Sequence, residues 1–403
     1  MIDAPIELPC GATLPNRLAK AALSEQLGDA RHAPSDQLIR LYQRWSNSGA
    51  GLLITGNVMV DRNAIGEPAN VVVEGRRDLD RLRRWARSAK AGGATVIVQV
   101  NHPGRQVPVN VSRRPVAPSA IPMKGMMGAF ATPRALTVKE IHEIQDRFAR
   151  TSKVLVAAGF DGVQLHGAHG YLISQFLSPL ANQRTDEYGG DPVNRRRFLM
   201  ELVEKTREAI GPDKILSVKI NSADFQRGGF TEDESLDVAR ELDRAGIDLL
   251  EISGGTYEQA AMMGVVRRES TRQREAYFLD FAERLRSEVA LPLMVTGGFR
   301  TRVGMDEALD SGAVDVIGLG RPLAVQPEAP CQLLSGEVKS LDALTEKRVG
   351  VRKLDALAET VWYTTQMWRM GRGKDPATTR PAALGVSHYF LGGVAYSVRK
   401  KVS

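Results

Sequence analysis

The chain has 403 residues and a formal net charge of +7; 43% of its residues are hydrophobic and 25% are charged. These proportions are ordinary for a globular protein, and no apolar run is long enough to span a bilayer. The arginines lie along helix-like faces without interleaved aromatic residues, which favours a solvated basic surface over a nucleic-acid interface. We therefore expect no nucleic-acid partner and no integral membrane segment.

Cysteine usage and the N-terminal stretch indicate the compartment. Cys10 and Cys331 are isolated and form no CxxC pair, so we predict no metal or iron–sulfur site and a reducing environment. The first residues are acidic and proline-containing, where a signal peptide would need a basic start and an apolar core. We expect the protein to be cytoplasmic.

Short apolar strands and amphipathic helices alternate along the chain. Eight strands are predicted, at Arg17–Leu23, Gly51–Asn57, Thr95–Asn101, a run ending at His166, Ile215–Asn221, Ile247–Ser253, Leu293–Thr296 and Val314–Leu319. Helices are predicted at Ser35–Ser48, Asp78–Ala91, Val138–Ala158, Pro192–Ile210, Glu232–Ala245, Arg274–Val289 and Arg302–Asp310. Continuous apolar strands indicate a parallel sheet covered on both faces. The pattern predicts an α/β fold, a (β/α)8 TIM barrel over residues 1–335. A doubly wound sheet is the alternative, but its glycine-rich fingerprint is missing after the first strand.

Two segments interrupt this alternation. Residues 102–137, a long loop after the third strand, are interpreted as a lid over the barrel mouth, or alternatively as a surface excursion. Its candidate lid residues are Met123, Met126, Met127 and Phe130. Residues 336–403 are expected to form a helical extension, with a helix at Leu354–Met370, that packs on the barrel or on a partner subunit. The apolar and then basic tail favours docking on protein over contact with an anionic surface.

Glycines and an arginine follow the last two strands. Gly297 and Gly298 come after strand seven, and Gly320 and Arg321 come after strand eight. Glycines let backbone amides approach an anion, and the loops at these two positions form the usual phosphate site of this fold. Tight turns would explain the glycines alone, but not their pairing with Arg321.

Two polar residues interrupt apolar strands. Gln99 lies within strand three and Lys219 within strand five. A buried amide and a buried lysine both need partners, so Gln99 could bond its neighbours and Lys219 could pair with Glu251. The alternative is that both face a planar, phosphorylated, electron-accepting ligand, and flavin mononucleotide (FMN) fits that description.

The fourth strand ends in a cluster of polar groups, His166, His169 and Tyr171. Two imidazoles can donate hydrogen bonds to one oxygen, and a nearby phenol can deliver a proton. A metal pair is the main alternative, but no carboxylate stands at metal-like spacing. Capping of loop backbone would account for one histidine more readily than for both.

The sequence resembles the Old Yellow Enzyme family of FMN-dependent oxidoreductases. The matching motifs are GFDGVQLHGAHGYLISQFLSP, NQRTDEYGG, NRRRF, NRLAKAALSE, VIVQVNHPGRQ, VKINSADFQRGGFT, LEISGGTYE, VTGGFRT and IGLGRPL. They cover roughly residues 5–330. The resemblance implies a single-domain member with the same barrel.

The resemblance also implies roles for the matched positions. His166 and His169 would bind the oxygen of an α,β-unsaturated substrate, and Tyr171 would be the proton donor. The positions that would contact FMN are Ser24, Gly56, Gln99, Lys219, Gly297, Gly298, Gly320 and Arg321. Lys219 replaces a commoner arginine, which keeps the charge but loses bidentate geometry. Ala22-Leu23-Ser24 replaces a commoner Pro-Met-Thr or Pro-Met-Cys, which alters a position that tunes the flavin.

The resemblance implies an NAD(P)H:flavin oxidoreductase of the ene-reductase type. FMN would be reduced by NADH or NADPH and would pass a hydride from N5 to an unsaturated carbonyl compound, which takes its proton from Tyr171. Three alternatives stay open: an FMN-dependent dehydrogenase or demethylase acting in the oxidative direction, a non-catalytic FMN-binding redox protein, and a sugar-phosphate lyase. The sequence leaves a homo-oligomer open, with Trp362, Arg369 and Arg372 able to reach a neighbouring subunit.

Overall fold

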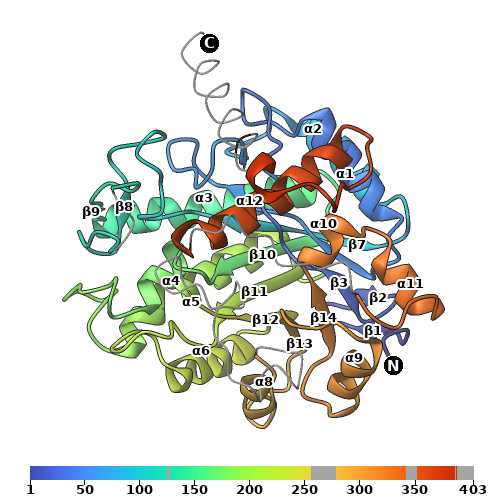
Figure 1. Cartoon of the computed structure of the whole chain (residues 1–403). Helices are drawn as coiled ribbons and strands as arrows, with labels where there is room; N and C mark the ends of the chain where they lie inside the picture. Colours follow the sequence, from blue (N-terminus) through green and yellow to red (C-terminus); the bar gives the residue numbers. More distant parts are fainter. Residues whose placement is uncertain (125–127, 256–277, 342–351, 386, 388–403) are drawn as a thin grey trace.

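A computed structural model describes residues 1–124, 128–255, 278–341, 352–385 and 387, with the backbone alone for residues 352–357. In this part of the chain, parallel strands pair in sequence order and the last pairs with the first, which closes a barrel (Figure 1). The barrel strands are β3 (Leu18–Lys20), β4 (Leu52–Ile54), β7 (Thr95–Asn101), β10 (Gly162–Gly167), β11 (Ile215–Asn221), β12 (Leu249–Ser253), β13 (Leu293–Thr296) and β14 (Val316–Leu319). The predicted (β/α)8 barrel is confirmed.

The helices between the strands lie on the outside of the barrel (Figure 1). They are α1 (Asp36–Ser46), α2 (Leu79–Lys90), α3 (Val138–Ala157), α5 (Pro192–Ile210), α6 (Glu232–Arg244), α8 (Leu279–Arg286) and α9 (Arg302–Asp310). Strands β7, β11 and β13 and helices α5 and α9 have the predicted bounds. The first, second, sixth and eighth strands are shorter than predicted. The predicted helix start at 274–277 lies outside the described residues. No helix in the described part of the chain combines the length and apolar character needed to cross a bilayer.

The N-terminal hairpin closes one end of the barrel and was not predicted. It consists of β1 (Ile6–Glu7) and β2 (Thr13–Leu14), which pair antiparallel. Its Leu8 and Leu14 pack on apolar side chains from inside the barrel, which include Leu52, Ile97, Ile215, Leu249, Met294 and Val316. This end of the barrel is therefore filled with apolar side chains.

Three short helices were also missed by the sequence, at α4 (Leu172–Leu177), α10 (Arg321–Val325) and α11 (Ala329–Ser335). The predicted C-terminal helix lies within α12 (Arg352–Gly371), which packs against α1 and α10 at the barrel opening (Figure 1). The Trp368 indole N–H donates to the Glu25 carbonyl at 2.9 Å, and Arg40 donates to the Gly371 carbonyl at 3.1 Å. In this structure α12 therefore rests on its own barrel.

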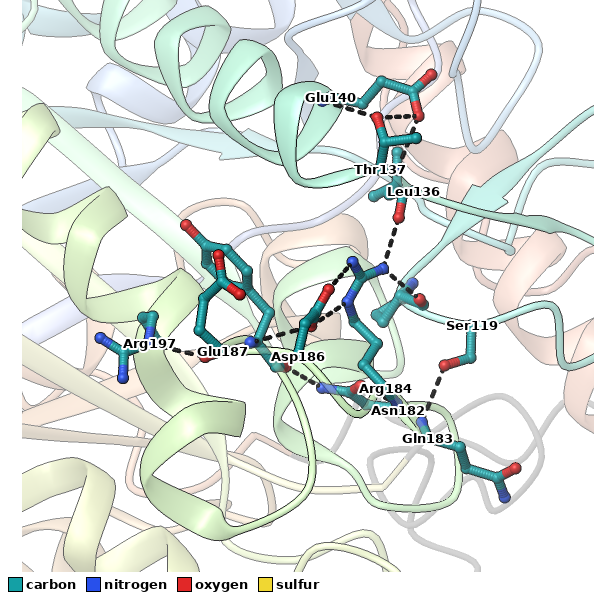
Figure 2. Close-up of polar contacts among 12 residues, drawn as sticks. Ser119, Leu136, Thr137, Glu140, Asn182, Gln183, Arg184, Asp186, Glu187 and Arg197 are labelled. Atoms are coloured by element: carbon teal, nitrogen blue, oxygen red, sulfur yellow. Dashed lines mark hydrogen bonds and ion pairs between the residues drawn. The ribbon is translucent and has the colours of Figure 1, made fainter.

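The long excursion after β7 carries two further short strands, β8 (Val116–Ala117) and β9 (Arg134–Ala135), which pair with each other. Arg184 fastens both of them to the loop after α4 (Figure 2). Its Nη1 donates to the carbonyls of Pro118 at 2.9 Å and Leu136 at 2.5 Å, while its guanidinium pairs with Asp186. Arg184 thus holds the base of the excursion closed.

Helix α3 begins at a capping box formed by Thr137 and Glu140. The Thr137 hydroxyl accepts from the Glu140 backbone N–H, and the Glu140 carboxylate accepts from the Thr137 N–H at 2.9 Å (Figure 2). This capping box satisfies two backbone donors that the first helical turn leaves without intrahelical partners.

We expect Thr137→Ala to lower the free energy of unfolding by about 1 kcal/mol, because the hydroxyl cap is lost. Urea unfolding followed by circular dichroism measures the change. Thr137→Ser keeps the hydroxyl and should lose much less. Equal losses in the two variants would show that the cap does not carry the stabilisation.

Candidate active site

A cavity lies at the C-terminal ends of the barrel strands, between the loops of the barrel and α12. Its lining includes Ser24, His169, Lys219, Gly297, Gly298, Gly320 and Arg321, which the sequence singled out. It also includes residues the sequence did not single out, among them Glu67, Ser253, Thr296 and, from α12, Glu359, Thr360, Tyr363, Thr364 and Met367. Gln99, Gly56, His166 and Tyr171 are not among its lining residues.

The predicted lid does not contribute to this cavity within the described residues, since no lining residue comes from 102–137. Met126 and Met127 lie outside the described residues. The outer wall is formed instead by α12, which is distant in sequence from every other lining segment.

Three rings from the end of β10 and the following turn lie together beside the cavity. The His166 and His169 ring centroids are 5.1 Å apart, and those of His166 and Tyr171 are 4.8 Å apart, both in edge-to-face geometry. His169 adopts a left-handed backbone conformation, with φ of 60°. Two hydrogen bonds hold that turn: the His169 N–H donates to Asn221 Oδ1 at 3.1 Å, and Gln106 donates to the His169 carbonyl at 2.9 Å.

The hydrogen bonds of the two imidazoles orient their donors. The Ala168 backbone N–H donates to His166 Nδ1 at 3.3 Å, so the proton of the neutral ring is on Nε2. His169 Nε2 lies 2.8 Å from the Ser253 hydroxyl, which can donate or accept. Burial, and then the nearby positive charge of Lys219, hold the pKa of His169 well below its usual value. Burial and the neighbouring His169 do the same to the pKa of His166, with a smaller effect from Lys219. Both rings are therefore neutral hydrogen-bond donors at neutral pH.

A chain of polar groups crosses the barrel interior beneath the cavity. Lys219 Nζ forms an ion pair with Glu251 Oε1 at 2.8 Å, and both side chains are almost completely buried. Gln164 Nε2 donates to Glu251 Oε2 at 2.9 Å, and Gln99 Nε2 donates to Gln164 Oε1 at 2.8 Å. Lys219 thus has the partner that the sequence offered as an alternative, Glu251, whereas the Gln99 amide bonds the side chain of Gln164 and not its backbone neighbours. Lys219 nevertheless also lines the cavity, whereas Gln99 connects to it only through this chain.

The loops after β13 and β14 meet at one end of the cavity. Gly297 and Gly298 have φ of 119° and 99°, which side-chain-bearing residues rarely adopt. The Thr296 hydroxyl beside them is buried without a hydrogen-bond partner. Arg321, at the start of α10, donates to Glu359 Oε1 at 3.1 Å. This end of the cavity therefore presents close-approach backbone, an unpaired hydroxyl and a guanidinium.

Gly56 packs against the first loop, residues 21–25, which follows β3. A side chain there would come within 2.0 Å of Glu25 Oε2 and 2.1 Å of the Leu23 carbonyl, and the Gly56 N–H donates to Glu25 at 3.0 Å. Gly56 therefore supports the loop that carries Ser24. The Ser24 hydroxyl in turn donates to Glu67, and burial raises the pKa of that carboxyl.

The sequence contained a signal for some of the residues at the cavity that were not predicted. Asn221 and Ser253 are the last residues of β11 and β12, the strand ends where barrel enzymes place functional groups. Glu67 and Glu359 had none, because one lies in a loop and the other on a helix whose position the sequence pattern does not give.

Barrel topology and a largely apolar cavity with a few polar groups at the strand ends are features of cofactor-dependent barrel enzymes. Residues 2–339 match the NADH:flavin oxidoreductase / NADH oxidase family. The chain belongs to this family, which is the Old Yellow Enzyme family, and is a flavin oxidoreductase whose cofactors are FMN and a nicotinamide dinucleotide.

Individual relatives support this assignment. The chain is 38% identical over 366 residues to the NADH-dependent flavin oxidoreductase iliE of Hypocrea jecorina, covering 84% of this chain and 90% of that protein. It is 32% identical over 341 residues to the NADH oxidase of Thermoanaerobacter brockii, and the match covers 83% of this chain and 51% of that protein. Among solved structures, the Old Yellow Enzyme homologue from Zymomonas mobilis superposes with a TM-score of 0.70 at 26% identity, covering 84% and 93%.

The residues of the cavity fit a phosphorylated flavin. A guanidinium, two positive-φ glycines and the unpaired Thr296 hydroxyl can receive a phosphate at one end. Lys219 adds a buried positive charge to the cavity lining, which would suit the electron-rich ring of a reduced flavin.

The Lys219–Glu251 pair yields a stability prediction. We expect Lys219→Met to lower the free energy of unfolding by about 3–5 kcal/mol, because Glu251 is left buried without its counter-charge. The double variant with Glu251→Gln should recover most of this loss. Chemical denaturation of the flavin-free proteins measures both.

Lys205→Met is the matched control, because Lys205 pairs with Asp146 at the surface. Its loss should be much smaller, as surface pairs contribute little. If Lys219→Met and Lys205→Met lose the same amount, the buried pair is not the structural constraint described here.

Proposed function

We propose that this protein is an NADH-dependent ene-reductase that reduces the activated C=C bond of α,β-unsaturated carbonyl compounds. The observation that carries the proposal is the grouping of two neutral imidazole donors and a phenol, His166, His169 and Tyr171, beside the cavity. The choice of NADH is supported by relatives that bear the name NADH-dependent flavin oxidoreductase, from Hypocrea jecorina and Aspergillus parasiticus.

The cavity residues would hold FMN in a defined direction. Arg321 and the backbone of Gly297, Gly298 and Gly320 would bind the phosphate, and Lys219 would lie beside the ring. Ser24 lines the cavity directly, whereas Gly56 and Gln99 would act indirectly, through the first loop and through the Gln164–Glu251–Lys219 chain. When bound, FMN supplies the hydride chemistry, taking electrons from the dinucleotide and delivering them to the unsaturated substrate.

The two histidines would bind the carbonyl oxygen of the substrate. Neutral imidazoles donate hydrogen bonds without placing a fixed positive charge in the site, and the negative charge that develops on the oxygen strengthens those bonds. The Ala168 N–H and the Ser253 hydroxyl orient the rings, so little reorganisation is needed when the oxygen arrives. His166 and His169 would therefore lower the barrier to addition at the β-carbon.

Tyr171 would deliver the proton to the α-carbon. Its side chain is 4% exposed and its ring packs against His166, so the phenol is held in one place and shielded from bulk water. A phenol keeps its proton at neutral pH and gives it up to a strongly basic carbon.

An anaerobic absorbance experiment tests the function. The purified protein with bound FMN is bleached with NADH or NADPH, and cyclohexenone is then added. We expect NADH to bleach the flavin faster and cyclohexenone to restore the yellow colour as the enone is consumed. Recovery only on admission of oxygen would contradict the ene-reductase assignment.

Tyr171→Phe separates the two half-reactions. Flavin bleaching by NADH should be preserved, and reduction of a weakly activated enone should slow by roughly a hundredfold, because the general acid is lost. Tyr188→Phe is the control, since Tyr188 is equally buried but bonds Glu201 away from the cavity. Stopped-flow absorbance gives both rates. Enone reduction at the parental rate in Tyr171→Phe would remove Tyr171 from the mechanism.

A further inference from the structure

Helix α12 is part of the cavity wall. Thr360, Tyr363, Thr364 and Met367 lie on successive turns and all line the cavity. The helix is held on the barrel by Trp368, which donates to the Glu25 carbonyl in the first loop. Anything bound in the cavity therefore contacts α12 as well as the barrel.

One ion pair joins α12 to the end of the cavity proposed for the phosphate. Arg321 Nη1 lies 3.1 Å from Glu359 Oε1, and the two side chains are 28% and 22% exposed. The guanidinium that would bind a phosphate is thus already engaged by a carboxylate. Carboxylate and phosphate oxygens accept from the same kind of N–H donor, so a phosphate that takes the Nη1 donor must displace the Glu359 carboxylate from it.

The groups around the Arg321–Glu359 pair would also act on a phosphate bound beside it. Glu359 lines the same cavity as the two glycine loops, so a phosphate there would lie close to its negative charge. Burial raises the pKa of Tyr363 to about 12, while the positive charge of Arg321 acts in the opposite direction and Glu359 adds to the increase. Tyr363 is therefore a neutral phenol that lines the same cavity and experiences the charges of both residues.

We propose that Glu359 is the internal occupant of the phosphate-binding arginine, and that the FMN phosphate exchanges with its carboxylate when the cofactor binds. The inference rests on the proposed phosphate role of Arg321. Glu359 then sets how strongly the protein prefers a phosphorylated flavin, because part of the phosphate's gain is offset by breaking the Arg321–Glu359 pair and by repulsion from the released carboxylate. A flavin without a phosphate leaves the pair intact.

Titration of the flavin-free protein with FMN and with riboflavin tests the proposal, with flavin fluorescence quenching as the readout. In Glu359→Gln we expect FMN to bind about threefold more tightly, the size of effect typical of a partly exposed ion pair, and riboflavin to bind with unchanged affinity. Glu359→Ala should change FMN affinity in the same direction. The readout is binding, so it does not depend on turnover.

Two comparisons make the test specific. Glu328→Gln removes the same charge from an ion pair with Arg44 away from the cavity, and FMN affinity should not change. In an Arg321→Met background, FMN should bind more weakly and Glu359→Gln should lose most of its effect, because the two residues act on each other.

The outcomes distinguish an error in the proposed exchange from an error in the proposed phosphate site. If Arg321→Met weakens FMN but Glu359→Gln leaves FMN affinity unchanged or weakens it, the exchange is wrong while the phosphate site stands. Equal tightening of FMN and riboflavin in Glu359→Gln would also overturn the exchange. If Arg321→Met does not weaken FMN, the phosphate site itself is wrong and the exchange fails with it.

Discussion

The buried ion pair between Lys219 and Glu251 is the constraint on which the rest of the site depends. A charge inside a barrel is tolerated only when a partner and hydrogen bonds compensate for the lost water, and both are present here. The register of the parallel strands places the charged partner, because Lys219 aligns with Glu251 on β12. On its other side Lys219 aligns with His166 on β10. The same positive charge contributes to keeping His166 and His169 neutral. One lysine therefore links the electrostatics of the barrel interior to the donors at its rim.

One end of the barrel is packed with apolar side chains, and the other end carries the candidate site. The hairpin carrying Leu8 and Leu14 fills the N-terminal end with apolar contacts, so stability there does not depend on the site. At the other end the strands stop at residues with polar side chains, such as Asn221 and Ser253, which position the turn and the ring of His169. The left-handed backbone conformation of His169, which costs a side-chain-bearing residue free energy, also occurs at this end.

The sequence predicted the barrel well because its strands are continuous apolar runs that alternate with helical segments. Thr95–Asn101 matches to the residue as such a run, and Pro192–Ile210 does so because proline stands at its first position and Gly211 follows its last. The sequence picked out residues that line the cavity where a polar side chain interrupts an apolar strand, as with Lys219, or follows a strand end, as with His169. The sequence could not predict which residues line the cavity where their place depends on packing between segments that are distant in the chain. Nothing in a local pattern places α12 over the cavity, or shows that the amide of Gln99 is engaged by Gln164.

Two of the cationic side chains that line the cavity, Lys219 and Arg321, are held by their partners to different degrees. Lys219 and Glu251 are 4% and 0% exposed, so separating them would leave two charges without solvent, and no ligand can displace that carboxylate at low cost. Arg321 and Glu359 are partly exposed, so water can take over the solvation of whichever anion is released. Lys219 is therefore suited to a fixed influence on a bound ring, since its position does not change on binding. Arg321 is suited to an exchange, in which the protein holds the arginine in place with its own carboxylate until a phosphate arrives.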